Sequence, residues 1–270
     1  MTYRIISLLY NMKKCIIHTL LLFSLICSSC APHPGKADPV VAPKVILKDF
    51  MTYLNYNTRE LKFSEDFSTY STAGAPISKA QFFSLYASGA YLPIRLKAED
   101  GQLVYRLYGV SEFNTTTDML RTIKQFGSYA ENEYLQIGKP LTGFNFTDLH
   151  GKVYTTDMLK GKIVALKFWF IKCHACNEEI PALNKVVEGY KDRKDILFLS
   201  LATDAPTDLQ AFLKKTKFNY AVISEQHNYL EKHFQTSSYP THVLINKKGI
   251  VTLVTSDAKT LTEKLKKEAS

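Results

Sequence analysis

Cys173 and Cys176 are separated by two residues and follow directly on the apolar run Ile163 to Phe170. A short apolar run of this kind is typical of a buried strand, and a helix that begins at Cys173 would set the two thiols about one turn apart. Two sulfurs at that spacing can close a disulfide, bind a metal or hold a haem. We therefore expect a fold in which a buried strand leads straight into a pair of thiols.

The first 30 residues hold the other three of the five cysteines, which are Cys15, Cys27 and Cys30. In this region Lys13-Lys14 precedes an apolar run over residues 16–26. That run is too short to cross a bilayer core of roughly 30 Å. A basic stretch followed by a short apolar run predicts a secretory signal peptide over residues 1–29.

The signal region ends in Cys27-Ser28-Ser29-Cys30, which resembles the lipobox of bacterial lipoproteins. The resemblance implies that Cys30 becomes the first residue of the mature chain and carries the lipid. Cys27 stands where Leu is usual in that motif, so Cys27 remains the alternative acceptor. Simple cleavage by signal peptidase, with free or paired cysteines, is the other interpretation.

Residues 30–44 contain four prolines, at positions 32, 34, 39 and 43. Such a segment favours an extended, semi-rigid spacer. We expect a proline-rich tether over residues 30–44 that holds the folded part away from a membrane surface.

Composition limits the classes of function. With 46% hydrophobic residues, the chain after the tether suffices for one large domain or two small ones. The formal net charge is +9, which could suggest nucleic acid or an anionic membrane as a partner. The basic residues are scattered among acidic ones, however, and the densest run lies at 264–267 near the C-terminus. We therefore expect no nucleic-acid partner.

Residues 45–135 are predicted to form a small α+β domain, for which the sequence indicates no role. Ser78 and Gln81 have the form of a capping box, which predicts a helix that Gly89 ends. The remaining predictions are helices over 45–56 and 117–130 and a hairpin over 92–107 that turns at Asp100-Gly101. The many aromatic residues are expected in its core, with a binding surface as the alternative.

From residue 138 onward, apolar strands alternate with helical segments. This pattern predicts an α/β fold with a mainly parallel sheet covered by helices on both faces. The expected segments are a short hairpin over 144–152, strands at 163–170, 196–202, 220–224, 241–246 and 250–255, and helices starting at the cysteines and near 207–215, 228–234 and 259–268.

Several ordered motifs between Ile137 and Lys267 resemble the TlpA/ResA-like thiol-disulfide oxidoreductases of the AhpC/TSA superfamily. They are Gly161-Lys162, Phe168-Trp169 before the cysteine pair, Glu179-Ile180-Pro181, and Tyr239-Pro240-Thr241 followed by Val243-Leu244-Ile245-Asn246 and Gly249. The resemblance implies a thioredoxin-like domain over residues 137–270, a central sheet flanked by helices, and exchange of electrons with protein thiols and disulfides. It implies no cofactor and no metal, and it leaves residues 45–135 unassigned.

A cysteine at a helix start lies beside free backbone N–H groups, which stabilise its thiolate. Cys173 is therefore expected to be the attacking nucleophile, and Cys176, one turn further in, the residue that resolves the mixed disulfide. His174 could add positive charge to this site when protonated, or it could be an exposed helix-cap residue. Lys172 could likewise favour the thiolate or could simply be solvated.

Glu179 lies three residues beyond Cys176, so both share one helix face, whereas Glu178 does not. In the resembled family a Glu at this position lies near the sulfurs and manages the proton of the resolving thiol. A partly buried carboxyl would have a raised pKa and could do so near neutral pH. The alternative is a surface glutamate. Pro181 is expected to kink the helix.

Tyr239-Pro240 matches the cis-proline loop that faces the cysteine pair in thioredoxin folds, so both residues are candidates for binding substrate. A trans proline in a surface turn is the alternative. Trp169 is expected to pack beneath the site, with a direct part in substrate binding as the second interpretation.

Other chemistries fit less well. A c-type haem site needs His after the second cysteine, where this chain has Asn177, and a peroxiredoxin needs Thr or Ser where it has Phe170. Copper or another metal could still be bound by the two cysteines with His174 or His242, which makes a metal chaperone the alternative function. A third interpretation is a binding protein whose thioredoxin-like part is a scaffold.

Together these features predict a thiol-disulfide oxidoreductase of the bacterial cell envelope, lipid-anchored through Cys30 and facing the periplasm. It would exchange electrons with protein thiols or disulfides there and with a membrane electron donor or acceptor. Whether it reduces or oxidises depends on its potential, which the sequence does not fix.

Overall fold

The computed structural model describes residues 34–98, 101–235 and 238–270. The predicted signal peptide and lipobox, with Cys27 and Cys30, lie outside these residues. Among the described helices, none has the length and apolar character needed to pass through a bilayer.

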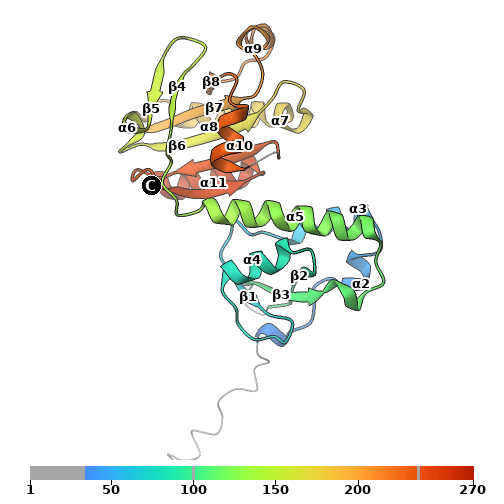
Figure 1. The fold of residues 1–270 in the computed structure, drawn as a ribbon. Helices are drawn as coiled ribbons and strands as arrows, with labels where there is room; N and C mark the ends of the chain where they lie inside the picture. The colour runs from blue at the N-terminus through green and yellow to red at the C-terminus, as the bar shows by residue number, and fades with distance from the viewer. Residues whose placement is uncertain (1–33, 99–100, 236–237) are drawn as a thin grey trace, which may run out of the picture.

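Residues 34–136, which we call the N-terminal unit, form a three-stranded sheet with helices packed against it (Figure 1). The sheet order is β1-β3-β2, with β1 parallel and β2 antiparallel to β3. Its elements are η1 (Pro34–Lys36), α2 (Pro43–Ile46), α3 (Phe50–Glu60), β1 (Phe67–Tyr70), α4 (Lys79–Ala87), β2 (Tyr91–Arg95), β3 (Leu103–Gly109), η2 (Val110–Glu112) and α5 (Thr117–Gln136).

The predicted hairpin and the predicted start of α4 are confirmed. Strands β2 and β3 pair directly, and Gly101 of the predicted turn has a positive φ of 73°, a conformation that glycine adopts without strain. The Ser78 hydroxyl accepts the N–H of Gln81 at 3.2 Å and so caps α4, which ends before Gly89.

The helix predicted over 45–56 is wrong as a single element. Helix α2 ends at Ile46, and α3 begins at Phe50 after Asp49, whose carboxylate accepts the N–H of Thr52 at 2.8 Å. Asp49 stabilises a new helix start there, so the apolar periodicity continues across a break in the backbone. Helix α5 runs to Gln136, six residues beyond the predicted end at Ala130.

Residues 34–44 do not form the free spacer that their prolines predict. The N–H of Val40 donates to the carbonyl of Arg95 at 2.9 Å, and the N–H of Lys97 donates to the carbonyl of Asp38 at 2.8 Å. Pro39 forms a bridge with Leu96, which lies just beyond β2. This segment therefore packs along the edge of β2 and belongs to the N-terminal unit.

Residues 137–270, the C-terminal unit, form a five-stranded sheet of order β10-β9-β6-β7-β8. Strands β6, β7 and β8 are parallel, β9 is antiparallel to β6, and β10 is antiparallel to β9. The sheet is made of β6 (Ile163–Trp169), β7 (Ile196–Ala202), β8 (Ala221–Ile223), β9 (Thr241–Ile245) and β10 (Val251–Thr255), and the hairpin β4 (Asn145–Thr147) and β5 (Val153–Thr155) stands apart. The helices are α6 (Thr156–Leu159), α7 (His174–Glu178), α8 (Ile180–Gly189), α9 (Pro206–Leu213), α10 (His227–Phe234) and α11 (Ala258–Ala269).

Alternate residues of β6 serve the two faces of this sheet. Leu166 packs on one face with Phe234 of α10. Ala165 lies on the other face with Leu183 of α8 and Leu261 of α11. Helices cover both faces, and the predicted α/β fold with a central sheet flanked by helices is confirmed.

Helix α5 joins the two units, since it belongs to the N-terminal unit and also contacts β10 and α10 (Figure 1). The chain after it continues along β10, where the N–H of Gly138 donates to the carbonyl of Val251 and that of Leu141 to the carbonyl of Gly249, each at 2.9 Å. A cavity of about 550 Å³ lies between the units and is lined by residues of both, including Glu133 and Asp257.

Candidate active site

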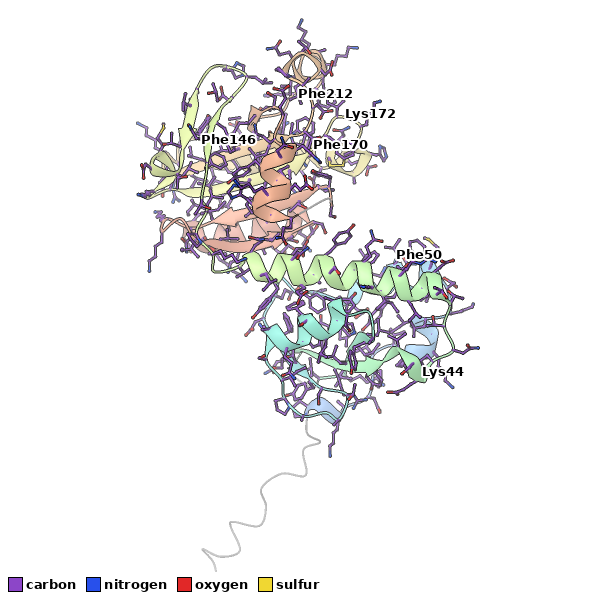
Figure 2. The ribbon with its side chains drawn as sticks, viewed as in Figure 1. Lys44, Phe50, Phe146, Phe170, Lys172 and Phe212 are labelled. Atoms are coloured by element: carbon purple, nitrogen blue, oxygen red, sulfur yellow. A yellow bond between two sulfur atoms is a disulfide. The ribbon has the colours of Figure 1, made fainter. Side chains whose placement is uncertain are left out.

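The cysteine pair lies where the central strand of the sheet meets a helix. Strand β6 ends at Trp169, and α7 begins at His174 with Cys173 as its N-cap residue. The Sγ atom of Cys173 accepts the N–H of Cys176 at 3.2 Å, and the two cysteines form a disulfide with 5.2 Å between their Cα atoms. Figure 2 shows this disulfide at the end of the unit that carries Phe170 and Lys172.

The two sulfurs differ in exposure. Cys173 is 7% exposed, whereas Cys176 is fully buried. An incoming thiol can therefore reach Cys173 more readily than Cys176. This order of exposure agrees with the roles that the sequence suggests for the two residues.

Trp169 lies in the core beneath the disulfide. It is fully buried in one cluster with both cysteines, and its ring packs against Phe212 and Phe218 with centroids 5.6 and 5.5 Å away. Because no part of its surface is exposed, direct contact with substrate is disfavoured in this state. The packing supports the core interpretation of Trp169 rather than substrate binding.

Two side chains fix the loop between β6 and α7. The carboxylate of Asp204 accepts the N–H of Ile171 at 2.8 Å, and the side-chain amide of Asn177 donates to the carbonyl of Ile171 at 2.8 Å. Both backbone groups of Ile171 are thus held, which positions the chain two residues before Cys173.

Glu179 occupies the break between α7 and α8, with Pro181 in the first turn of α8. Its carboxylate is 14% exposed and accepts from Nζ of Lys167, while Nε2 of His242 lies 3.1 Å away. Lys167 also donates to the carbonyl of Cys176 at 3.2 Å. Glu179 is therefore held between a buried lysine and a buried histidine, one turn from the inner cysteine.

The expected raised pKa of Glu179 is wrong. Burial raises the pKa of this carboxyl. The hydrogen bond and charge of His242, together with Lys167, lower the pKa by more than burial raises it, so the pKa lies below its usual value. Burial in turn lowers the pKa of the Lys167 ammonium, because desolvation outweighs its attraction to Glu179. Glu179 is accordingly a carboxylate at neutral pH.

Sequence reasoning missed Lys167 and considered His242 only as a metal ligand. Lys167 stands in a strand whose other residues are apolar, His242 follows Thr241 in a strand that is otherwise apolar, and each side chain is fully buried. A charged residue inside a buried strand is costly unless it is paired, so the lysine within Ile163 to Trp169 was the signal that could have indicated a buried partner.

The peptide bond between Tyr239 and Pro240 is cis, as predicted. Pro240 is buried and Tyr239 half-buried, and the Tyr239 ring contacts Phe170 edge-on with centroids 5.4 Å apart. Tyr239 also packs against the cluster that contains both cysteines. The loop before β9 and the loop before α7 therefore meet at the disulfide.

His174 and Lys172 are both exposed. Nε2 of His174 lies 3.0 Å from the carboxylate of Glu178, one turn along α7. His174 therefore has an acidic neighbour on the helix surface, which agrees with its interpretation as an exposed residue of the first turn.

Of the two histidines considered as metal ligands, His174 pairs with Glu178 and His242 pairs with Glu179 on the inner side of the site. Within the described ranges, no group of three or more His, Cys, Asp or Glu side chains is arranged to hold a metal ion.

The described geometry is a nearly buried disulfide at a helix start, next to a partly buried carboxylate and beside a cis-proline loop. The family model described as "AhpC/TSA family" matches residues 137–254. Thiol-disulfide oxidoreductase ResA of Bacillus cereus is 31% identical over 125 residues, which cover 46% of this chain and 72% of that protein. The chain belongs to the ResA-like thiol-disulfide oxidoreductases of the AhpC/TSA family.

Other relatives are more distant. Thioredoxin-like protein YneN of Bacillus subtilis is 24% identical over 129 residues, covering 47% of this chain and 75% of that protein. Among solved structures, a putative protein disulfide isomerase from Bacteroides thetaiotaomicron is 24% identical with a TM-score of 0.45, covering 49% of this chain and 89% of that one. As a member of this family, the protein is a thiol-disulfide oxidoreductase with a thioredoxin-like C-terminal unit.

Proposed function

We propose that this oxidoreductase exchanges electrons with protein thiols and disulfides in the bacterial cell envelope, through Cys173 as nucleophile and Cys176 as resolving residue. The observation that carries the proposal is the disulfide between a partly accessible cysteine at the start of α7 and a fully buried one next to it. Of the two cysteines only Cys173 has exposed surface, which favours Cys173 as the residue that an external thiol attacks first.

The exchange reaction proceeds in two steps. A substrate thiolate attacks Sγ of Cys173, the bond between the two sulfurs breaks, and Cys176 leaves with the electron pair and takes up a proton. A second substrate thiolate then attacks the substrate sulfur of the mixed disulfide and releases Cys173 as a thiolate. In the opposite direction Cys176 loses its proton and displaces the substrate from Cys173.

The surroundings of the disulfide support roles in the reaction for four further residues. Glu179, held under Cys176, exchanges the proton of the resolving thiol. Tyr239 and Pro240 form the loop against which an extended substrate segment lies. His174 contributes at the rim of the site, where its exposed ring is open to a partner.

Location in the envelope is proposed from the N-terminal sequence. We propose cleavage before Cys30, lipid attachment to that residue, and a folded part that faces the periplasm and meets a membrane electron donor or acceptor. We also propose that residues 45–135 and 137–270 are separate domains. Lipid labelling of the wild type and of Cys30→Ala tests the anchor, and Cys27→Ala distinguishes the alternative acceptor.

Substitution of each cysteine tests the exchange chemistry. Cys173→Ser is expected to abolish disulfide exchange, and Cys176→Ser is expected to accumulate mixed disulfides, which non-reducing electrophoresis and mass spectrometry would detect. Wild-type turnover in both variants would overturn the proposed function. An oxidised wild type that a dithiol fails to reduce would overturn it as well.

A further inference from the structure

A row of buried polar residues crosses the C-terminal sheet under the disulfide. Lys167 of β6 pairs in register with Ser200 of β7 and with His242 of β9, and His242 pairs with Thr255 of β10. Directly paired residues point to the same face of a sheet. All four are buried: Lys167, Ser200 and His242 are fully buried, and Thr255 is 7% exposed.

The rest of this sheet face is apolar. Ala165, Leu244 and Leu253 stand on the same strands, two residues along, and pack with α8 and α11. The polar row thus occupies the one end of the face that lies beneath the cysteines. Since burial of a lysine and a carboxylate costs free energy that apolar residues would avoid, stability alone gives no reason for these charges.

Glu179, at the junction of α7 and α8, contacts this row through its carboxylate. Lys167 donates to its Oε1 atom, and Nε2 of His242 lies 3.1 Å from both Oε1 and Oε2. In the described part of the chain, Glu179 is the hydrogen-bond partner of the His242 ring, because Nδ1 of that ring has none. Each of the two strands therefore supplies one partner of the carboxylate.

Lys167 also connects the carboxylate to the inner cysteine. Its Nζ atom donates to the carbonyl of Cys176 at 3.2 Å, so one ammonium group contacts both Glu179 and the backbone of the resolving residue. A change in the position of Lys167 would move the carboxylate relative to Cys176.

We propose that Lys167 and His242 are positioning residues of the exchange reaction, which fix the Glu179 carboxylate under Cys176 as the group that exchanges its proton. The inference rests on the proposed function. When the disulfide is reduced, Cys176 leaves as a thiolate and takes up one proton, which Glu179, the partly exposed member of the group, relays from solvent. When the disulfide forms, the Cys176 thiol gives this proton to Glu179 and its sulfur attacks the mixed disulfide.

The charged and titratable groups around Glu179 determine how this step depends on pH. Lys167 and His242 both lower the pKa of Glu179. Tyr220, buried just before β8, interacts electrostatically with Glu179, and Asp257, just before α11, interacts electrostatically with His242. Removal of either partner, Lys167 or His242, should therefore raise the pKa of Glu179 and shift the pH profile upward.

The protein has one tryptophan, Trp169, in the same buried cluster as both cysteines, so its fluorescence can follow reduction of the disulfide. We would measure the single-turnover rate of reduction by dithiothreitol, and of reoxidation by oxidised glutathione, between pH 5 and 9. Glu179→Gln is expected to slow the proton-dependent step about 100-fold, a typical effect of losing a general acid or base. Lys167→Met and His242→Phe are each expected to slow it about tenfold and to shift its apparent pKa upward.

Non-additivity separates positioning from a general effect on folding. If both residues act through the carboxylate, Lys167→Met combined with Glu179→Gln should be no slower than Glu179→Gln alone. Lys160→Met, which removes an exposed lysine from a surface ion pair, is the matched control and should react as the wild type does. If the rate of the double variant falls by the product of the two separate fold-decreases, the proposal is overturned. Wild-type rates and pH profiles in Lys167→Met and His242→Phe would also overturn it.

Removal of one partner leaves the others buried and unpaired, and such a variant could fail to fold. The triple variant Lys167→Met/Glu179→Gln/His242→Phe replaces all three groups at once and is expected to fold and to react at the rate of Glu179→Gln. A triple variant with the wild-type rate would contradict the inference. Failure of the inference is distinguishable from failure of the proposed function, because the proposed function is tested on the wild type and on the two cysteine variants, whereas the inference is tested on variants that keep both cysteines.

Discussion

The carboxylate of Asp204, just beyond the end of β7, accepts the N–H of Ile171 at 2.8 Å, in the loop that leads into Cys173. The carbonyl of Asp204 accepts a second bond, from the N–H of Glu225. One residue thus ties the loop before the nucleophile to the segment that follows β8, and the position of Cys173 depends on a neighbouring strand.

Loss of this carboxylate should loosen the loop. Asp204→Ala is expected to cost about 1–2 kcal/mol of folding free energy, as for a hydrogen bond to a charged group, and to slow disulfide exchange several-fold. Urea unfolding and dithiol reduction kinetics measure the two effects. Asp208→Ala, which removes an exposed carboxylate on α9, is the control, and an equal response of both variants would contradict the assigned role.

Gly127 of α5 lies against the backbone of the last turn of α4. A Cβ atom at this position would lie 2.4 Å from the carbonyl oxygen of Tyr86 and 2.9 Å from Cα of Ala87. Gly127→Ala is therefore expected to destabilise the protein by about 1–3 kcal/mol despite the better helix propensity of alanine. Gly189→Ala, where no atom lies within 4 Å of the added Cβ, is the matched control in thermal unfolding. Equal melting temperatures for the two variants would contradict the prediction.

Glu133 on α5 lines the cavity between the two units, and burial raises its pKa to about 7. A carboxyl with a raised pKa in the folded state binds its proton more tightly when folded. The stability that it contributes is fully present below the ordinary glutamate pKa of 4.5 and is lost as the pH rises through about 7.

Glu133→Gln should remove this pH dependence, because glutamine stays neutral. We expect the variant to equal the wild type near pH 4.5 and to be about 1 kcal/mol more stable at pH 8, allowing for the partial exposure of the side chain. Chemical denaturation at the two pH values checks this. A stability difference that does not change with pH would rule out the protonated carboxyl.

Asp148 organises the turn between β4 and β5 from a nearly buried position. Its carboxylate accepts from the N–H groups of His150 and Lys152 at 2.8 and 3.0 Å and from the hydroxyl of Tyr154 at 3.1 Å. Asp148→Ala is expected to cost about 2–4 kcal/mol, because three donors lose a charged acceptor. Tyr154→Phe removes only one of them and should cost about 1 kcal/mol. Equal denaturation midpoints for the two variants would contradict the stabilising role assigned to Asp148.

The elements that sequence predicted well are those with a local signal. Ile163 to Trp169 is apolar throughout apart from Lys167 and is bounded by Lys162, and Ser78 carries its own capping partner three residues on. Such features depend on neighbours in the chain. They were sufficient to predict the central strand and the start of α4.

The elements that were missed depend on residues far away. Strand β1 is only four residues long, and its partner strand is β3. Phe67 of β1 pairs with Leu103 of β3, which lies 36 residues later in the chain. No periodicity within so short a segment indicates a parallel pairing of this kind. The break at Asp49 was missed for the opposite reason, because one side-chain cap overrode a longer helical pattern.

The candidate site divides in the same way. The cysteine pair, Glu179 and the cis bond at Pro240 followed from motifs. The ionisation of Glu179 did not, because its partners Lys167 and His242 come from two strands that are 75 residues apart in the chain and adjacent in the sheet. Burial alone predicts a raised pKa, and only the paired geometry reverses the sign.

The pairing of residues 138–141 with β10 has a consequence for the behaviour of the protein in solution. An open sheet edge presents unpaired N–H and C=O groups that can recruit a strand of another molecule. Here the segment that leaves α5 occupies the backbone groups of Gly249 and Val251 on that edge. The connection between the two units therefore also protects the sheet against aggregation, and a break in the chain at this point would expose the edge as well as separate the units.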